Sequence, residues 1–236
     1  MDNSVVAKDS KFERLDPLLE EQAVGIIDEF LPKMQLIFHV RNMSDPFIDV
    51  DSTSWYDISK NTIFLFPEDE PFDLVVKEEL SHAVHAHANP RVYTSLNGCG
   101  GRFEDLSALY RKIMKRDRNT IGLKSLELTM LQSYLNMTKL RTLVECVASL
   151  GLLCVTESEE STNVLWTKME IINEEYQRTM KRYEENPFRL IELDGYGQAY
   201  EFLLQKRDHI QDYVPLLPAL ARARSWKKFL KITEDI

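Results

Sequence analysis

The change in hydrophobic periodicity at about residue 72 constrains the fold of this chain more than any other feature. Between about residues 35 and 66 the apolar residues form short runs that are typical of strands. From Phe72 onward they recur at the helical spacing of about 3.6 residues. A few strands followed by many helices predict an α+β domain with its sheet at the N-terminal end.

In the N-terminal part, proline and turn residues mark where the elements should end. Leu18 to Leu31 carries apolar residues at helical spacing. Pro32 should end that helix, because proline lacks an amide hydrogen and clashes with the preceding turn. Strand-like runs follow at 35–40 and 55–66, and a Ser-Lys-Asn turn interrupts the second run. We therefore expect one helix and a small sheet before residue 72.

The remaining sequence should be mostly helical. The expected helices cover residues 72–88, 104–116, 125–153, 163–185 and 197–213. A glycine-rich stretch at 97–101 predicts a flexible break, and the polar stretch 156–162 predicts a loop. The pattern predicts a loose arm over 1–16, an α+β domain over 17–155 and a helical C-terminal part over 156–236, with a single domain as the alternative.

Composition excludes several classes of protein. The 236 residues carry a formal net charge of -9, so the chain lacks the clustered Lys and Arg that neutralise phosphates, and we expect no nucleic-acid partner. Cys99, Cys146 and Cys154 form no CxxC pair, which favours a reducing compartment. No apolar run is long enough for a signal peptide or a membrane span. We expect a cytoplasmic protein without a membrane partner, whose oligomeric state the sequence does not specify.

The segment at 75–90, VVKEELSHAVHAHANP, contains several carboxylate and imidazole side chains, which can bind a metal ion and transfer protons. On a helix, Glu78, His82 and His85 lie within an arc of about 60°, and the apolar residues of the segment face the opposite side. Two ligands one turn apart can bind the same metal ion, and a carboxylate next to the first ligand, here Glu79, can take a proton from water at that ion. The segment therefore predicts a metal site.

Read from Glu79 to His85 as ELSHAVH, this segment resembles the HExxH helix of the zincin metallopeptidases, and of the gluzincin branch in particular. The motif is degenerate, because Glu78 stands where the family has its first histidine, although a carboxylate can also bind zinc. The resemblance covers roughly residues 20–155. It implies a zincin-like fold in which 61–66 is the edge strand that precedes the active-site helix.

The resemblance also implies roles for individual residues. His82 matches a zinc ligand and Glu79 the general base. The family's third ligand is a glutamate on a later helix, and Glu145 in LRTLVECVASLG is the best match. Glu78 or His85 would complete the ligand shell. The C-terminal helices of the family often supply a Tyr or His that stabilises an oxyanion, for which Tyr196 and His209 are the candidates.

Taken together, these matches imply a zinc-dependent hydrolase that acts on a peptide or protein substrate. The alternative is a catalytically inactive zincin-fold protein that serves as a binding or regulatory module. A helical interaction module without zincin ancestry would place Glu78 and His82 toward solvent, far from Glu145. Glu145 could then pair with Arg141, one turn earlier. A ferritin-like di-iron site would need a second Glu-x-x-His motif, which the sequence lacks.

Overall fold

The computed structural model describes residues 14–69, 71–115, 122–185 and 195–234, so most of the arm predicted for 1–16 lies outside the described residues. The helices are α1 (Pro17–Phe38), α2 (Phe72–Ala88), α3 (Pro90–Met114), α4 (Gly122–Val155), α5 (Glu159–Glu185), α6 (Tyr196–Gln205), the 3-10 helix η2 (Arg207–Leu216), α7 (Leu217–Ala221) and α8 (Trp226–Thr233). Three short strands between α1 and α2 are β1 (Phe47–Val50), β2 (Trp55–Asp57) and β3 (Thr62–Leu65). The fold is α+β, as the sequence predicts.

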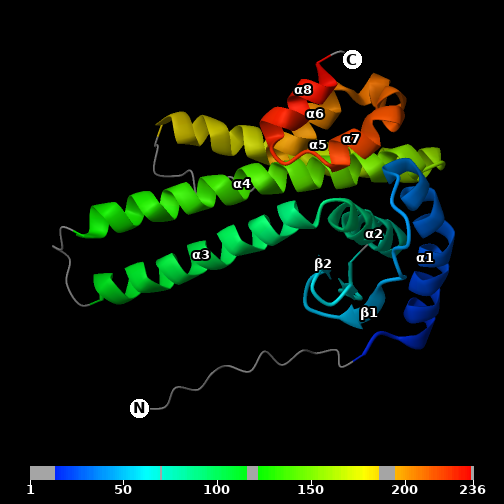
Figure 1. Cartoon of the computed structure of the whole chain (residues 1–236), viewed down its shortest axis with the longest axis horizontal. Helices are drawn as coiled ribbons and strands as arrows, with labels where there is room; N and C mark the ends of the chain where they lie inside the picture. The colour runs from blue at the N-terminus through cyan, green and yellow to red at the C-terminus, as the bar shows by residue number, and fades with distance from the viewer. Residues whose placement is uncertain (1–13, 70, 116–121, 186–194, 235–236) are drawn as a thin grey trace.

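The elements are layered around α2. In Figure 1, α2 lies between the strands on one side and α4 on the other, and α1 packs along its flank. Helices α6, α7 and α8 cover the far side of α4, and α5 packs against α6. One cluster of buried apolar side chains extends from Leu15 to Phe229 and joins these layers. Within the described ranges, no helix combines the length and the apolar character needed to cross a membrane.

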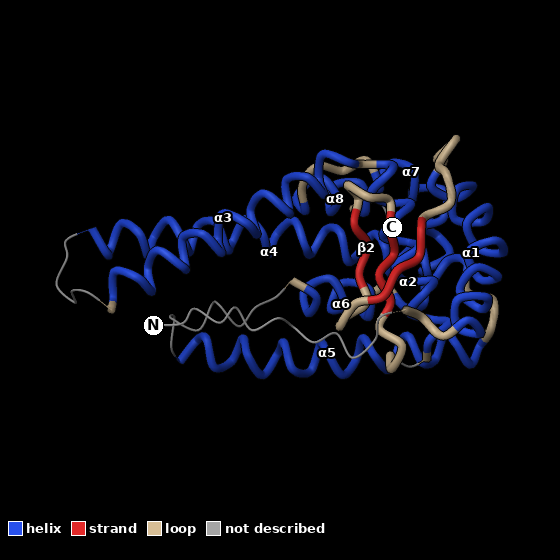
Figure 2. Tube along the Cα trace, turned by 90° about the horizontal axis from the view of Figure 1, so that it is seen from below, coloured by secondary structure: helices blue, strands red, loops and turns tan. Residues whose placement is uncertain are grey.

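The sheet has the order β1-β3-β2, with β1 parallel and β2 antiparallel to β3. Figure 2 shows the three strands together at the end of the molecule where α1 and α2 lie. The expectation of an edge strand at 61–66 is wrong, because β3 is the central strand and all four of its residues are buried. The partner that makes it central is β1, which the sequence analysis missed because four residues give too short an alternation to detect.

Helix α1 continues through Pro32 to Phe38, so the predicted helix end and the predicted strand at 35–40 are both wrong. A proline inside a helix costs about 3 kcal/mol. Met34 and Phe38 lie beyond the proline and are fully buried, and each such side chain contributes roughly 1.5–3 kcal/mol. Packing against the core therefore outweighs the local helix-breaking preference.

The predicted break at 97–101 is also wrong, because α3 is continuous from Pro90 to Met114. Helix α4 lies beside α3 in an antiparallel pair (Figure 1), and Ser133 Oγ on α4 donates a hydrogen bond to the carbonyl of Cys99 at 3.2 Å. The neighbouring helix thus supports the glycine-rich segment. The prediction of a helix over 72–88 is confirmed, whereas the single helix expected at 197–213 is divided into α6 and η2.

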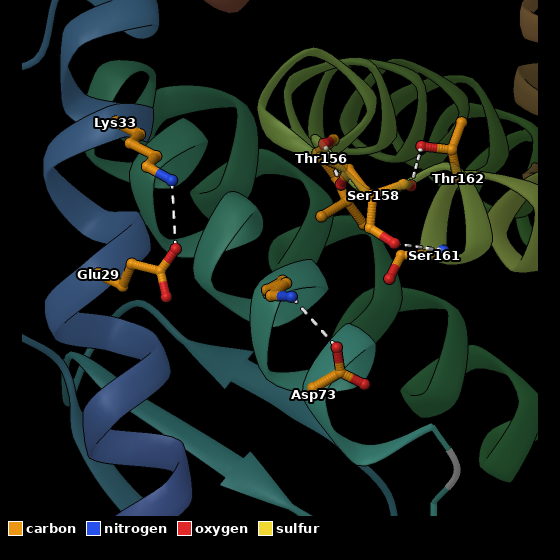
Figure 3. A network of polar contacts seen from close by, with 9 residues as sticks. Glu29, Lys33, Asp73, Thr156, Ser158, Ser161 and Thr162 are labelled. Carbon is orange, nitrogen blue, oxygen red and sulfur yellow. Dashed lines mark hydrogen bonds and ion pairs between the residues drawn. The ribbon is translucent and has the colours of Figure 1, made fainter.

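The turn between α4 and α5 is shorter than the loop expected at 156–162, because α5 begins at Glu159. Ser158 ends the turn by capping α5: its Oγ accepts from the amide of Ser161 at 3.3 Å, and its carbonyl accepts from Thr162 Oγ1 at 2.8 Å (Figure 3). Thr156 Oγ1 donates to the carbonyl of Leu152 at the end of α4. This tight reversal directs α5 back beside the start of α2.

Gly151 lies where α4 packs closely against α1 and α2. A Cβ at this position would overlap the ring of Phe38 and lie 3.1 Å from Ser81 Oγ. We expect Gly151→Ala to lower the free energy of unfolding by about 1–3 kcal/mol, because the neighbouring side chains must leave their preferred positions. Urea unfolding followed by circular dichroism measures this change.

Gly25 is a matched control in the interior of α1, since it is exposed and a Cβ there meets nothing within 4 Å. Gly25→Ala should raise the free energy of unfolding by roughly 0.5–1 kcal/mol, because alanine has the better helix propensity. Stabilisation by both substitutions would contradict the close packing at Gly151.

Candidate metal centre

A buried hydrogen bond sets the alignment of α2 with α4. Ser81 Oγ donates to the carbonyl of Ala148 at 2.7 Å, and Ser81 has no exposed surface. His82 directly follows Ser81 on α2, and Glu145 lies one turn before Ala148 on α4. The bond therefore fixes the relative positions of these two side chains.

The structure brings together three of the four metal ligands predicted from the sequence. Glu78 and His82 lie on successive turns of α2, and Glu145 reaches them from α4. The three side chains offer ligand atoms that lie within 4.8 Å of one another. His82 Nε2 is 3.3 Å from Glu145 Oε2, and both side chains are nearly excluded from solvent. This group could bind a metal ion.

The contact between His82 and Glu145 has the spacing of two ligands of one ion. Nitrogen and carboxylate ligands lie about 2.0–2.2 Å from zinc, so two tetrahedral ligands lie roughly 3.4 Å apart. The observed 3.3 Å is longer than a typical charge-assisted hydrogen bond, and Glu145 Oε2 accepts no well-aligned hydrogen bond although it is buried. One imidazole nitrogen and two carboxylates form a donor set that suits a divalent metal ion.

Lys168 contacts the third member of this group and was not predicted from the sequence. Its Nζ lies 2.6 Å from Glu78 Oε2, and it reaches this position from α5. Nothing in the local sequence marks Lys168, because its position depends on the reversal of the chain between α4 and α5. The ammonium supplies positive charge to Glu78 in the metal-free protein.

A cleft of about 410 Å³ reaches the group at Glu78, and its lining also includes Glu79, Lys168 and Tyr196. Burial raises the pKa of Glu79 to about 7, with the neighbouring carboxylates adding to the effect and His82 opposing it. The Glu145 carboxylate, together with burial, raises the pKa of the Tyr196 hydroxyl well above its usual value, so this group remains a neutral donor. The cleft thus combines a carboxyl group that titrates near neutrality with a hydroxyl.

The protonation of His82 is controlled by its carboxylate partner. Burial alone would lower the pKa of His82, but the negative charge of Glu145, with smaller contributions from Glu79 and Glu78, outweighs burial and raises the pKa to about 9. In the metal-free protein at neutral pH, His82 therefore carries a positive charge that compensates Glu145. A metal ion would take the place of the proton on Nε2.

His85 does not join the group, although it was a candidate ligand. It is fully buried, its Nδ1 lies 3.3 Å from the Tyr93 hydroxyl, and its ring stacks against Phe38. Tyr93 Oη is also 3.2 Å from His82 Nδ1 and was missed by the sequence analysis. The only sequence signal for this contact is Pro90, which predicts that α2 ends and the chain turns, without showing which residue then faces α2.

His209, a candidate oxyanion stabiliser, lies on η2 and is exposed, where its Nδ1 is 3.2 Å from Asp212 Oδ2. It is not among the residues that line the cleft, whereas Tyr196 is. Arg141 lies over the ring of Tyr196, 5.8 Å from its centroid. The geometry expected for an interaction module, with His82 toward solvent and far from Glu145, is contradicted by the contact between the two.

Comparisons with protein-family models, with characterised proteins and with solved structures find no match to this chain. The function of the site is therefore inferred from its geometry and from the sequence motif.

The two buried histidines should make opposite contributions to the pH dependence of stability of the metal-free protein on either side of pH 6.5, the usual pKa of histidine. Glu79, whose pKa is raised from 4.5 to about 7, opposes the His85 contribution above pH 4.5. Burial lowers the pKa of His85 to about 3, so the unfolded chain binds a proton that the folded chain does not, and stability falls as the pH drops from 6.5 toward 3. The raised pKa of His82 makes the folded chain hold the extra proton, so stability falls as the pH rises from 6.5 to about 9. Urea titrations in EDTA across this range measure both slopes.

The variant His85→Gln should flatten the acid limb of this profile by up to about 1.4 kcal/mol per pH unit, because its side chain does not titrate. His87→Gln is the control, since His87 is exposed on the same helix and should leave the profile unchanged. An acid limb of unchanged slope in His85→Gln would contradict the burial of neutral His85.

Proposed function

We propose that this protein is a metal-dependent hydrolase of the zincin type, with a zincin-like fold and a degenerate gluzincin motif. Glu78, His82 and Glu145 would hold the ion, and zinc is the metal that the motif implies. The observation that carries the proposal is the convergence of these three side chains from two helices, with Glu78 and Glu79 lining an open cleft. The substrate would be a peptide bond in a peptide or protein.

The arrangement of elements supports this assignment. The Glu-Glu-x-x-His sequence lies on α2, and the glutamate that completes the group comes from the later helix α4, as the motif predicts. Buried carboxylates are stable only when they are paired or coordinate a metal. Glu145 Oε2 is buried and lacks a well-aligned hydrogen bond, which agrees with a ligand role.

Two residues of the cleft, Glu79 and Tyr196, have defined tasks in this proposal. A bound divalent ion would act as a Lewis acid that polarises a carbonyl and lowers the pKa of water. Glu79, in the cleft and adjacent to Glu78, would accept the proton of the attacking water on its carboxylate and pass it to the leaving amine. Tyr196 would donate a hydrogen bond from its hydroxyl to the developing oxyanion.

We expect the purified protein to bind one Zn²⁺ per chain, measured by isothermal titration calorimetry and elemental analysis. Saturation at 100 times the dissociation constant should raise the free energy of unfolding by about 2.7 kcal/mol. His82→Ala and Glu145→Gln should each abolish stoichiometric binding, because each removes one of three ligands. His87→Ala, exposed on the same helix, should bind zinc like the wild type.

The zinc-loaded protein should hydrolyse a mixture of fluorescence-quenched peptides. Glu79→Gln should keep the metal and lose at least about 10²-fold in rate, because the general base is removed while the ligands remain. Glu21→Gln, an exposed position on α1, should retain full activity. Zinc binding without peptide hydrolysis in the wild type would contradict the peptidase assignment.

The ion pair between Lys168 and Glu78 favours a second candidate function, a non-catalytic zincin-fold protein that acts as a binding or regulatory module. In that case the ammonium of Lys168 and the proton on His82 would replace the metal charge permanently. The same titration separates the two functions. A protein that takes up no zinc, and whose melting temperature is unchanged by a chelator, would support the second and refute the first.

A further inference from the structure

A tyrosine hydroxyl joins the candidate ligand His82 to a histidine outside the ligand group. Tyr93, near the start of α3, has its hydroxyl 3.2 Å from His82 Nδ1 and 3.3 Å from His85 Nδ1. All three side chains are buried, and the rings of His85 and Tyr93 meet edge to face at a centroid distance of 5.3 Å. Tyr93 contacts His82 on the side of the ring opposite Glu145, because His82 Nδ1 faces the tyrosine hydroxyl and Nε2 faces the carboxylate.

The direction of these hydrogen bonds is fixed by the protons available. A tyrosine hydroxyl has one proton, so it can donate to one Nδ1 only and must accept from the other. With a metal ion on Nε2, the neutral ring of His82 keeps its proton on Nδ1. In that state Tyr93 must accept from His82 and donate to His85.

The same direction sets the tautomer of His85. When His85 Nδ1 accepts from Tyr93, the single proton of the neutral His85 ring lies on Nε2. Nε2 is buried and makes no well-aligned hydrogen bond, so Tyr93 is the hydrogen-bonding partner that sets this tautomer.

We propose that Tyr93 is a positioning residue that holds His82 in its Nδ1–H form and so directs the lone pair of Nε2 toward Glu145 and the metal ion. The inference rests on the proposed metal site for its functional meaning. A group that donates or accepts on the far side of a histidine ligand fixes the tautomer and the ring orientation, and its loss typically lowers metal affinity by 10–100-fold.

The first test is the zinc affinity of Tyr93→Phe, measured by competition with a chromophoric chelator and Zn²⁺ alone. We expect 10–100-fold weaker binding than in the wild type, because His82 loses the acceptor that favours a proton on Nδ1. Tyr110→Phe is the matched control. Tyr110 lies on the same helix, and its hydroxyl donates to Glu127 Oε1 at 2.9 Å, so this substitution also removes a hydrogen-bonded tyrosine hydroxyl. Wild-type affinity in a folded Tyr93→Phe protein would overturn the proposal.

Two substitutions of His85 separate positioning from packing. His85→Leu leaves Tyr93 without an acceptor, so its hydroxyl turns toward His82 Nδ1 and favours the wrong tautomer; we expect a loss of zinc affinity similar to that of Tyr93→Phe. His85→Gln supplies an amide oxygen that can accept, and should recover most of the affinity. Equal affinities in the two variants would overturn the proposed direction of the chain.

The second readout does not depend on zinc affinity. Nitrogen-15 NMR of histidine-labelled protein with one equivalent of Zn²⁺ should show His85 protonated on Nε2 and accepting on Nδ1, and this signature should disappear in Tyr93→Phe. A wild type that binds no zinc but shows this signature would refute the metal site and support the role of Tyr93. A proton on His85 Nδ1 in the wild type would overturn the role of Tyr93 even if zinc binds.

Discussion

The approach of His82 to Glu145 across the interface of α2 and α4 is the constraint on which the rest of the structure depends. A carboxylate and an imidazole facing each other in a dry interior are stable only if the two helices hold a fixed alignment and separation. The bond from Ser81 to Ala148 sets the alignment. The missing side chain of Gly151 allows the close approach. The fold therefore maintains a charged pair inside its core rather than filling the position with apolar groups.

Charge compensation explains why so many ionisable groups gather at this point. Glu78, Glu79 and Glu145 converge, and each carboxylate that loses water needs a cation or a proton. The chain itself offers Lys168 to Glu78 and a proton on His82 to Glu145. We propose that a divalent ion takes over the second of these roles, so that occupancy of the site and release of the proton from His82 are the same event.

The sequence predicts the parts of the site that lie on one helix, and one residue beyond it. Helix α2 and the common direction of Glu78 and His82 follow from periodicity, and Glu145 follows from its motif, because these signals are local. Tyr93 and Lys168 are placed by the paths of α3 and α5, which depend on packing between distant segments. The helix end predicted at Pro32 is wrong for a related reason. The helix-breaking preference of proline is local, whereas the burial of the following residues of α1, which overrides it, depends on distant segments.

The far end of α2 is closed by the C-terminal part of the chain. The side-chain amide of Asn89 donates to the carbonyls of Ala221 and Ala223 at 3.0 and 2.8 Å, which fastens the last turn of α7 over the region of His85. The final helices thus cover this end of the core and exclude water from it. A protein that lost them to proteolysis would admit water to the imidazoles and weaken the electrostatics of a site whose own residues remain intact.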